Sequence, residues 1–263
     1  DRFRVITGTS FLSNDLEWVR SHAPADGSVE VRDVTDDFAC IGMWGPGARD
    51  VLGQATDDDI SNDSFPYLTA RQLTVAGKPA WAQRVSYVGE LGWELYLANT
   101  DAGAVWDALI ELGQAHGIRP AGYKALDSLR LEKGYVYWST DVTPEDNLLE
   151  AGMGFCADMA KGDFIGRNAL AKRKANGLQT RLRTVILEGN ALPAYGAESV
   201  WHDGEIVSRL RSAGHAHTID RSIAYCYLPL PLAKPGTAVE IELFGERVPA
   251  KVTLPIHDPK GTR

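Results

Sequence analysis

A carboxylate inside an apolar, strand-like run is the first feature of this sequence that is suited to chemistry. The run is YVGELGWELY, residues 87–96, and its central acid is Glu94. Strand alternation places Glu94 and Tyr96 on one face. The opposite face carries Trp93, Leu95 and Leu97. A partly buried carboxylate needs donors, and a flat heterocycle with adjacent N–H groups supplies two while it stacks on aromatic rings. Pterins, guanines and cytosine-like rings have this chemistry; the alternative is an edge-strand glutamate that pairs with arginine or faces water.

The turn before this strand suggests a neighbour for the carboxylate. If residues 90 and 91 form a two-residue hairpin loop between two glycines, the antiparallel register places Tyr87 directly opposite Glu94. We therefore expect one face of the sheet to carry an acid that is flanked by aromatic side chains.

Three other patterns favour structural interpretations. His215 and His217 have the spacing of two metal ligands, but no Cys or acidic cluster accompanies them, so we expect no metal site. The acidic run 56–63 lacks the glycine and the final glutamate of an EF-hand loop, which favours a solvated turn. KGDFIG, residues 161–166, lacks the signature of a phosphate loop, and Asp163 is expected to cap a helix there.

Composition narrows the classes of partner. With 263 residues, 44% of them hydrophobic, the chain is long enough for one large or two modest domains. No apolar run reaches the length of a membrane helix. The net charge is −8 and the basic residues are dispersed, so we expect small molecules or proteins as partners, and neither nucleic acid nor membrane. Arginine in excess over lysine favours a bacterial cytoplasm, or a mitochondrial matrix if the protein is eukaryotic.

The cysteines and the first residues give two further expectations. Cys40, Cys156 and Cys226 are far apart in apolar runs, so we expect reduced thiols packed in the core. The chain opens with DRFRVITGTSF, and residues 3–7 alternate like a half-buried strand. Since no initiator Met precedes them, we expect a fragment, a processed product or a polypeptide whose earlier part is absent.

The elements that position these residues alternate in type up to about residue 178. We expect a helix from a cap at Asn14 to about residue 20, a helix from Pro46, and helices at 99–117 and 120–134, the first with Val105, Trp106, Leu109 and Leu112 on one face. A further helix follows the cap at Asp163. Strands are expected at 29–34, at 38–44 and in three runs within 68–97, with turns at 76–79 and 89–92.

The last third of the chain has a different pattern. Short strand-like runs within 183–189, 197–214, 222–229 and 238–252 are separated by Gly, Pro and Asp turns, which is typical of a small antiparallel barrel or sandwich. The sequence therefore predicts the α+β class, with one domain at 1–178 and a β-barrel domain at 179–263.

Four ordered motifs together resemble a known family. YVGELGWELY, GYKALDSLRLEKGY, TDVTPEDNLLEAGMGF and KGDFIGRNAL occur in the order and spacing of the tetrahydrofolate-dependent aminomethyltransferases, the glycine cleavage T-protein family. The likeness is greatest to the C-terminal folate domains of dimethylglycine and sarcosine dehydrogenases or oxidases. It implies a T-protein-like folate-binding domain followed by a barrel, and it covers essentially the whole chain.

The resemblance also implies a cofactor and a reaction. Tyr87, Glu94 and Phe155 match the positions that hold the pterin of tetrahydrofolate, and Thr7 is a weaker match near the folate. We assign Leu95 and Tyr96 to the same cofactor-binding site. In the dehydrogenase branch, an N-terminal domain with FAD oxidises an N-methyl amine to an iminium. The folate domain then captures the one-carbon unit as 5,10-methylenetetrahydrofolate.

Departures from the family pattern refine the expectation. Leu126 stands where T-proteins carry an arginine that reaches the folate, which favours the dehydrogenase branch. The catalytic Asp of the family lies upstream of the segment that residues 1–8 resemble, so we assign no catalytic residue to this chain. Cys156, beside Phe155, is expected to pack rather than react, and Lys161 is a possible contact for the folate tail.

Three alternatives remain. The first is a free-standing aminomethyltransferase that acts on an aminomethyl-lipoyl carrier, against which Leu126 argues. The second is a non-enzymatic folate-binding paralogue that assists iron–sulfur assembly, but such paralogues carry Cys where this chain has Asp163. The third is a catalytically silent folate-binding fragment.

Overall fold

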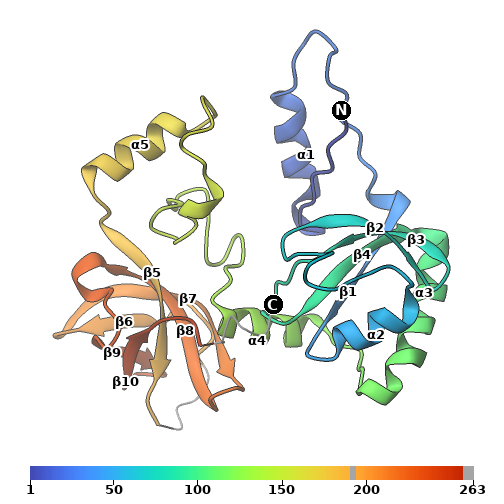
Figure 1. Ribbon diagram of the computed structural model, residues 1–263. Coiled ribbons are helices and arrows are strands. Elements are labelled where there is room, and N and C mark those ends of the chain that lie inside the picture. Colours follow the sequence, from blue (N-terminus) through green and yellow to red (C-terminus); the bar gives the residue numbers. More distant parts are fainter. Residues whose placement is uncertain (190–193, 257–263) are drawn as a thin grey trace.

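The first part of the chain is built around a four-stranded antiparallel sheet in a computed structural model that describes residues 1–189 and 194–256. The strand order is β1-β4-β3-β2. Their bounds are β1 Phe38–Trp44, β2 Ala70–Val75, β3 Lys78–Gln83 and β4 Gly92–Ala98. Helices α2 (Ala48–Ala55) and α3 (Asn99–Gly113) pack with one face of the sheet in a single apolar core (Figure 1). The opposite face of the sheet is left for polar and aromatic side chains.

The last part of the chain is a closed barrel of six antiparallel strands in the order β10-β5-β8-β7-β6-β9. The bounds are β5 Thr180–Leu187, β6 Ser199–His202, β7 Glu205–Ala216, β8 Arg221–Pro229, β9 Ala238–Leu243 and β10 Glu246–Thr253. Buried Val, Leu and Ile side chains from all six strands fill its interior. The α+β class and the antiparallel barrel are therefore confirmed. The boundary between residues 178 and 179 stays a prediction.

Helix α4, Tyr123–Lys133, lies between the sheet and the barrel (Figure 1). It packs against β7 and β8, and the hydroxyl of Tyr225 on β8 donates to the carbonyl of Leu131 at 2.6 Å. The helix ends at Gly134, as the sequence predicted, because the left-handed conformation there (φ 83°) suits glycine. Its first residue is Tyr123 rather than Pro120, since residues 118–122 are not helical.

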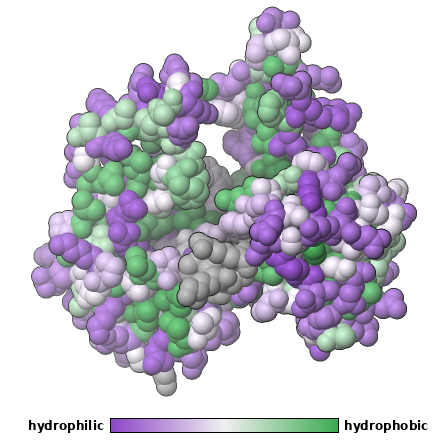
Figure 2. All heavy atoms as spheres, viewed as in Figure 1, coloured by the Kyte–Doolittle hydropathy of each residue, from purple (hydrophilic) through white to green (hydrophobic). Residues whose placement is uncertain are grey.

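Two further helices have no buried residues. They are α1 (Leu12–Ser21) and α5 (Arg167–Asn176), and Figure 1 places them on opposite sides of the upper part of the molecule. Figure 2 shows an opening between the two parts of the surface that hold them. Short 3-10 helices complete the chain: η1 Thr9–Phe11, η2 Thr35–Asp37, η3 Gln114–His116, η4 Gly154–Cys156 and η5 Leu230–Leu232. Within the described residues, no helix is long and apolar enough to cross a membrane.

Several expected helix starts were wrong. Asn14 lies inside α1, because the 3-10 turn η1 leads directly into the helix, and its amide donates to Asp15. Asp163 accepts from the N–H of Phe164, but α5 starts only at Arg167, after Gly166 in the left-handed conformation. The second helix starts at Ala48, two residues after Pro46.

Some expected strands and buried positions were also wrong. Residues 3–7 and 29–34 form no strand, since β1 is an edge of the sheet and its described partner is β4 alone. Trp106 is exposed although Val105 and Leu109 of the same helix are buried. Of the three cysteines, Cys226 is buried in the barrel, whereas Cys40 lies on the outer face of β1 and Cys156 lies in η4, which has no buried residue, so both are exposed.

Candidate functional site

The outer face of the four-stranded sheet carries Glu94 at its centre. The expected alternation is confirmed: Trp93, Leu95 and Leu97 are fully buried, whereas Glu94 and Tyr96 are half-buried. The hydroxyl of Tyr96 donates to Oε2 of Glu94 at 2.7 Å. No hydrogen bond reaches Oε1 from any residue that the structure describes. The carboxylate is thus oriented by one aromatic neighbour and keeps an oxygen ready for an external donor.

Aromatic rings border this carboxylate on the sheet. Opposite Glu94 lie Gly42 on β1 and Gln83 on β3. A side chain on Gly42 would overlap the indole of Trp44, so glycine lets that ring lie flat against the strand beside the acid. The indole N–H of Trp44 donates to the carbonyl of Val85 at 2.9 Å, which fixes the ring. A flat surface next to a fixed acceptor is therefore built into the sheet.

The same face holds two groups that stay neutral. Burial, and then the hydrogen bond to Glu94, raises the pKa of Tyr96 above its ordinary value. Burial of the thiol, together with the charge of Glu94, raises the pKa of Cys40 to about 11, although the residue as a whole is exposed. Tyr96 pairs with Cys40 on β1 and with Trp81 on β3. At neutral pH these three side chains are uncharged, so the row offers a hydrogen-bond donor and aromatic rings without adding a charge.

The expected hairpin between Tyr87 and Glu94 was wrong. The residue opposite Glu94 on β3 is Gln83, and residues 84–91 leave the sheet as an eight-residue connection. Burial decides this path, because Ser86, Val88 and Leu91 all pack inward. The glycine pair that suggested a tight turn therefore serves a longer loop.

Tyr87 lies in a second cluster, at the junction of the sheet with the segment after α4. Its hydroxyl donates to the carbonyl of Val136 at 2.9 Å, and its ring stacks on Tyr135 with centroids 6.0 Å apart. Burial, reinforced by Asp141 and opposed by Arg130, raises the pKa of Tyr87 to about 12. The side chain is neutral and well held, and no hydrogen bond joins it to Glu94 among the described residues.

The remaining predicted residues lie in three different places. Leu95 is in the sheet core, with its side chain on the face opposite Glu94. Phe155 lies in η4 and is 86% exposed, and Thr7 is exposed and donates to Asp15. The structure brings only Glu94 and Tyr96 into contact. The assignment of all six residues to a folate site stays a prediction.

The sequence reasoning missed a buried ion pair that supports Tyr87. Arg130 of α4 donates to Asp141 at 2.6 Å and to the hydroxyl of Ser212 on β7 at 2.7 Å. Asp141 also accepts from the backbone N–H groups of Tyr137 (2.7 Å) and Ser212 (2.9 Å). The pair therefore ties α4, the barrel and the segment next to Tyr87 together. No local signal reveals it, because Ser212 is distant in sequence.

The expectation about metals concerned His215 and His217. Their rings meet edge to face with centroids 4.9 Å apart, and His215 pairs with Asp220 at 3.1 Å. In the described ranges, no group of three or more His, Cys, Asp or Glu side chains is placed to hold a metal ion.

Comparison with known proteins supplies the class and then the family. A solved structure, the glycine cleavage system aminomethyltransferase T from Bartonella henselae, superimposes with a TM-score of 0.82 at 21% identity, over 96% of this chain and 68% of that one. That likeness shows the fold. The sequence model described as GCVT N-terminal domain matches residues 1–161, and the one described as glycine cleavage T-protein C-terminal barrel domain matches 181–257. The chain belongs to the glycine cleavage T-protein family.

Two kinds of relative share this sequence. The human mitochondrial dimethylglycine dehydrogenase is 38% identical over 252 residues, which is 95% of this chain but 29% of that protein. The human mitochondrial sarcosine dehydrogenase is 40% identical over 204 residues, 77% of this chain and 22% of that protein. The aminomethyltransferase of Halothermothrix orenii is 31% identical over 252 residues, 96% of this chain and 69% of that protein. The chain thus spans less than a third of the dehydrogenases that it matches.

Proposed function

We propose that this chain is the tetrahydrofolate-binding, one-carbon-transfer portion of an N-methyl amine dehydrogenase or oxidase of the dimethylglycine and sarcosine type. The observation that carries the proposal is the Glu94–Tyr96 pair on the exposed face of the sheet. Its unused carboxylate oxygen and the bordering indole of Trp44 fit a flat heterocycle with adjacent N–H groups. The dehydrogenase relatives, at 36–40% identity, support the choice of branch.

Each side chain has a defined task in this proposal. Glu94 accepts from the ring N–H groups and fixes the orientation of the pterin, and Tyr96 keeps that carboxylate in place. Tyr87, whose hydroxyl donates to the carbonyl of Val136 and whose ring stacks on Tyr135, borders the ligand with an aromatic ring. Bound folate would supply the N5 and N10 amines; the one-carbon unit of the iminium bonds to both as its bond to the substrate nitrogen breaks, and the products are 5,10-methylenetetrahydrofolate, the demethylated amine and a proton. The iminium substrate comes from a flavin-containing oxidase domain of the same or a partner chain.

Calorimetric titration with 5-formyltetrahydrofolate tests the proposal. Glu94→Gln keeps the shape of the side chain but removes its charge and replaces one acceptor by a donor. We expect a loss on the order of 2–4 kcal/mol, which is about a 30-fold to 1000-fold weaker affinity. Glu111→Gln, the same change at an exposed position of α3, is the matched control and leaves binding unchanged. Equal affinity of Glu94→Gln and the unaltered chain would remove Glu94 from the site.

A second function is supported by the aminomethyltransferase relatives, which this chain matches over most of their length. In that reading the one-carbon donor is an aminomethyl-lipoyl carrier instead of an iminium. Leu126, which is half-buried on α4, cannot provide the ionic contact that T-proteins make at that position. Single-turnover transfer from each donor to tetrahydrofolate decides between the two. Turnover with the lipoyl carrier alone would favour the aminomethyltransferase.

A further inference from the structure

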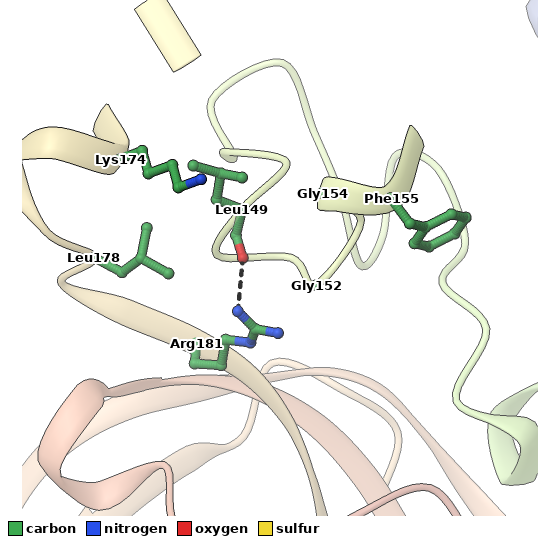
Figure 3. A pocket seen from close by; sticks show the side chains of 7 residues that line it. All are labelled: Leu149, Gly152, Gly154, Phe155, Lys174, Leu178 and Arg181. Carbon is green, nitrogen blue, oxygen red and sulfur yellow. Dashed lines mark hydrogen bonds between the residues drawn. The ribbon is translucent and has the colours of Figure 1, made fainter. Parts of the chain in front are cut away.

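A cavity of about 330 Å³ lies where helix α5 leads into the barrel, away from the Glu94 face. It is open to solvent and is bordered by the loop before η4 on one side and by the start of β5 on the other (Figure 3). Its lining residues are Leu149, Gly152, Gly154, Phe155, Lys174, Leu178 and Arg181. Figure 3 shows the side chains of Lys174 and Leu178 pointing toward Leu149, whereas the ring of Phe155 points away. The cavity thus has two leucine walls and two cations.

The positive charge in this cavity lacks a counterion. Arg181 donates from Nη1 to the carbonyl of Leu149 at 3.0 Å, while its Nε is buried and has no partner among the described residues. Neither Arg181 nor Lys174 forms an ion pair with any carboxylate in those ranges. Burial, and then the nearby charge of Arg181, lowers the pKa of Arg183, two residues along the same strand.

A neighbouring acid, Glu150, already has a partner on each carboxylate oxygen. Glu150 receives Arg173 at 2.8 Å on one oxygen. Its other oxygen accepts from the N–H groups of Gln179 (2.9 Å) and Thr180 (3.1 Å). Glu150 therefore neutralises Arg173 and closes the turn into β5. It forms no ion pair with either cation of the cavity.

The glycines keep the approach to the guanidinium open. Gly152 adopts φ 80°, and a side chain there would begin 3.8 Å from Nη2 of Arg181. Nη2 of Arg181 has no acceptor among the described residues, and a bound carboxylate would supply one. The leucine walls suit the short methylene chain between two carboxylates. Lys161 is less suitable, since its ammonium lies over the ring of Phe164 at 5.3 Å.

We propose that this cavity binds a glutamate-sized dicarboxylate through Arg181 and Lys174. The assignment of that ligand to the glutamyl tail of a reduced folate rests on the function proposed above; a free dicarboxylate is the other source of the same chemistry. Arg181 binds one carboxylate of the ligand from within the cavity, and Lys174 binds the same carboxylate from helix α5.

Calorimetry with ligands that differ only in their tails tests the proposal on the whole 263-residue chain. The ligands are 5-formyltetrahydropteroate, which has no glutamate, 5-formyltetrahydrofolate with one, and its triglutamyl form. We expect the glutamyl tail to improve affinity roughly tenfold, the worth of one charge-assisted hydrogen bond. Lys174→Gln and Arg181→Gln remove that gain and leave binding of the pteroate unchanged. Lys172→Gln, an exposed lysine of α5 outside the cavity, is the matched control and retains it.

A glutarate titration separates the two sources and keeps the test independent of the pterin site. If Lys174→Gln weakens glutarate binding, the cavity is a dicarboxylate site. If the glutamyl tail of the folate ligands nevertheless has no effect on their affinity, the natural ligand is a free dicarboxylate. The proposal is overturned if the gain in affinity from the glutamyl tail and the affinity for glutarate are both the same in the unaltered chain, Lys174→Gln and Arg181→Gln. Loss of all folate binding only in Glu94→Gln speaks to the proposed function instead. Since Lys174 is exposed, its variant stays informative if Arg181→Gln fails to fold.

Discussion

Arg130 and Arg181 occupy opposite situations in the same protein. Arg130 is almost fully buried and lies between Asp127 at 2.6 Å and Asp141 at 2.6 Å, with Ser212 satisfying its remaining nitrogen. Arg181 lines a cavity, has one carbonyl partner and forms no ion pair with a described carboxylate. The first arginine is saturated by the protein itself, and the second has donors to spare. Saturation indicates a structural tie, whereas a shortage of acceptors indicates a place for a ligand.

Breaking the saturated pair has the largest expected effect. Asp141→Ala leaves the buried Arg130 charge without its main partner and removes the acceptor for two backbone N–H groups. We expect a loss of about 3–5 kcal/mol in the free energy of unfolding, measured by urea denaturation. The matched control is Asp127→Ala, because Asp127 pairs with the same arginine but is 60% exposed. Asp127→Ala should lower the free energy of unfolding by less than about 1 kcal/mol. Similar losses in both variants would mean that the buried and the exposed partner of Arg130 contribute equally.

The sequence predicts well those features that depend on local alternation. The bounds of β1 and the inward direction of Trp93, Leu95 and Leu97 follow from period two, because a half-buried sheet imposes that period on its residues. Glu94 and Tyr96 were placed on one face by the same rule. The barrel was expected from its regularly spaced turns, since hairpins between neighbouring strands are local events.

Features that depend on distant packing escaped prediction. Residues 89–92 have the composition of a tight turn, yet burial of Val88 and Leu91 draws the chain into a longer loop and moves Tyr87 away from Glu94. Residues 29–34 have strand-forming side chains but form no strand, although β1 is an edge of the sheet. Nothing in the sequence around Arg181 and Lys174 marks them as ligand-binding residues. They stand out only in the structure, because the neighbouring carboxylate is already paired with another residue.

Glu150 gives the next largest expected effect on stability. It pairs with Arg173 at the edge of the cavity but not with the cations inside it. Burial alone would raise the pKa of Glu150, but the hydrogen bonds from Arg173, Gln179 and Thr180 outweigh it and lower that pKa below its ordinary value. The carboxylate therefore stabilises the fold above the pKa of the unfolded chain, about 4.3, and this contribution disappears as the pH falls through the lower folded value.

Glu150→Gln tests that linkage. We expect a loss of about 1–3 kcal/mol at pH 7, since a buried charge-assisted acceptor of three donors is replaced by an amide. The difference between the variant and the unaltered chain should begin to shrink near about pH 4.3 and disappear as the pH falls through the lower folded pKa of Glu150. Urea denaturation from pH 7 to pH 3 measures both. A constant difference across that range would mean that the carboxylate charge contributes nothing.

The smallest expected change in stability is at Phe155, which lies in η4 beside the cavity. Phe155→Ala should alter the free energy of unfolding by less than about 0.5 kcal/mol, because the side chain is 86% exposed. Phe65→Ala, the same substitution at a fully buried position of the sheet core, should cost about 3–5 kcal/mol. If Phe155 stacks on the pterin, its variant should bind 5-formyltetrahydrofolate about two- to tenfold more weakly at unchanged stability. Unchanged affinity would mean that this exposed ring serves a contact other than folate, and a large loss of stability would mean that the segment around η4 is packed as firmly as the sheet.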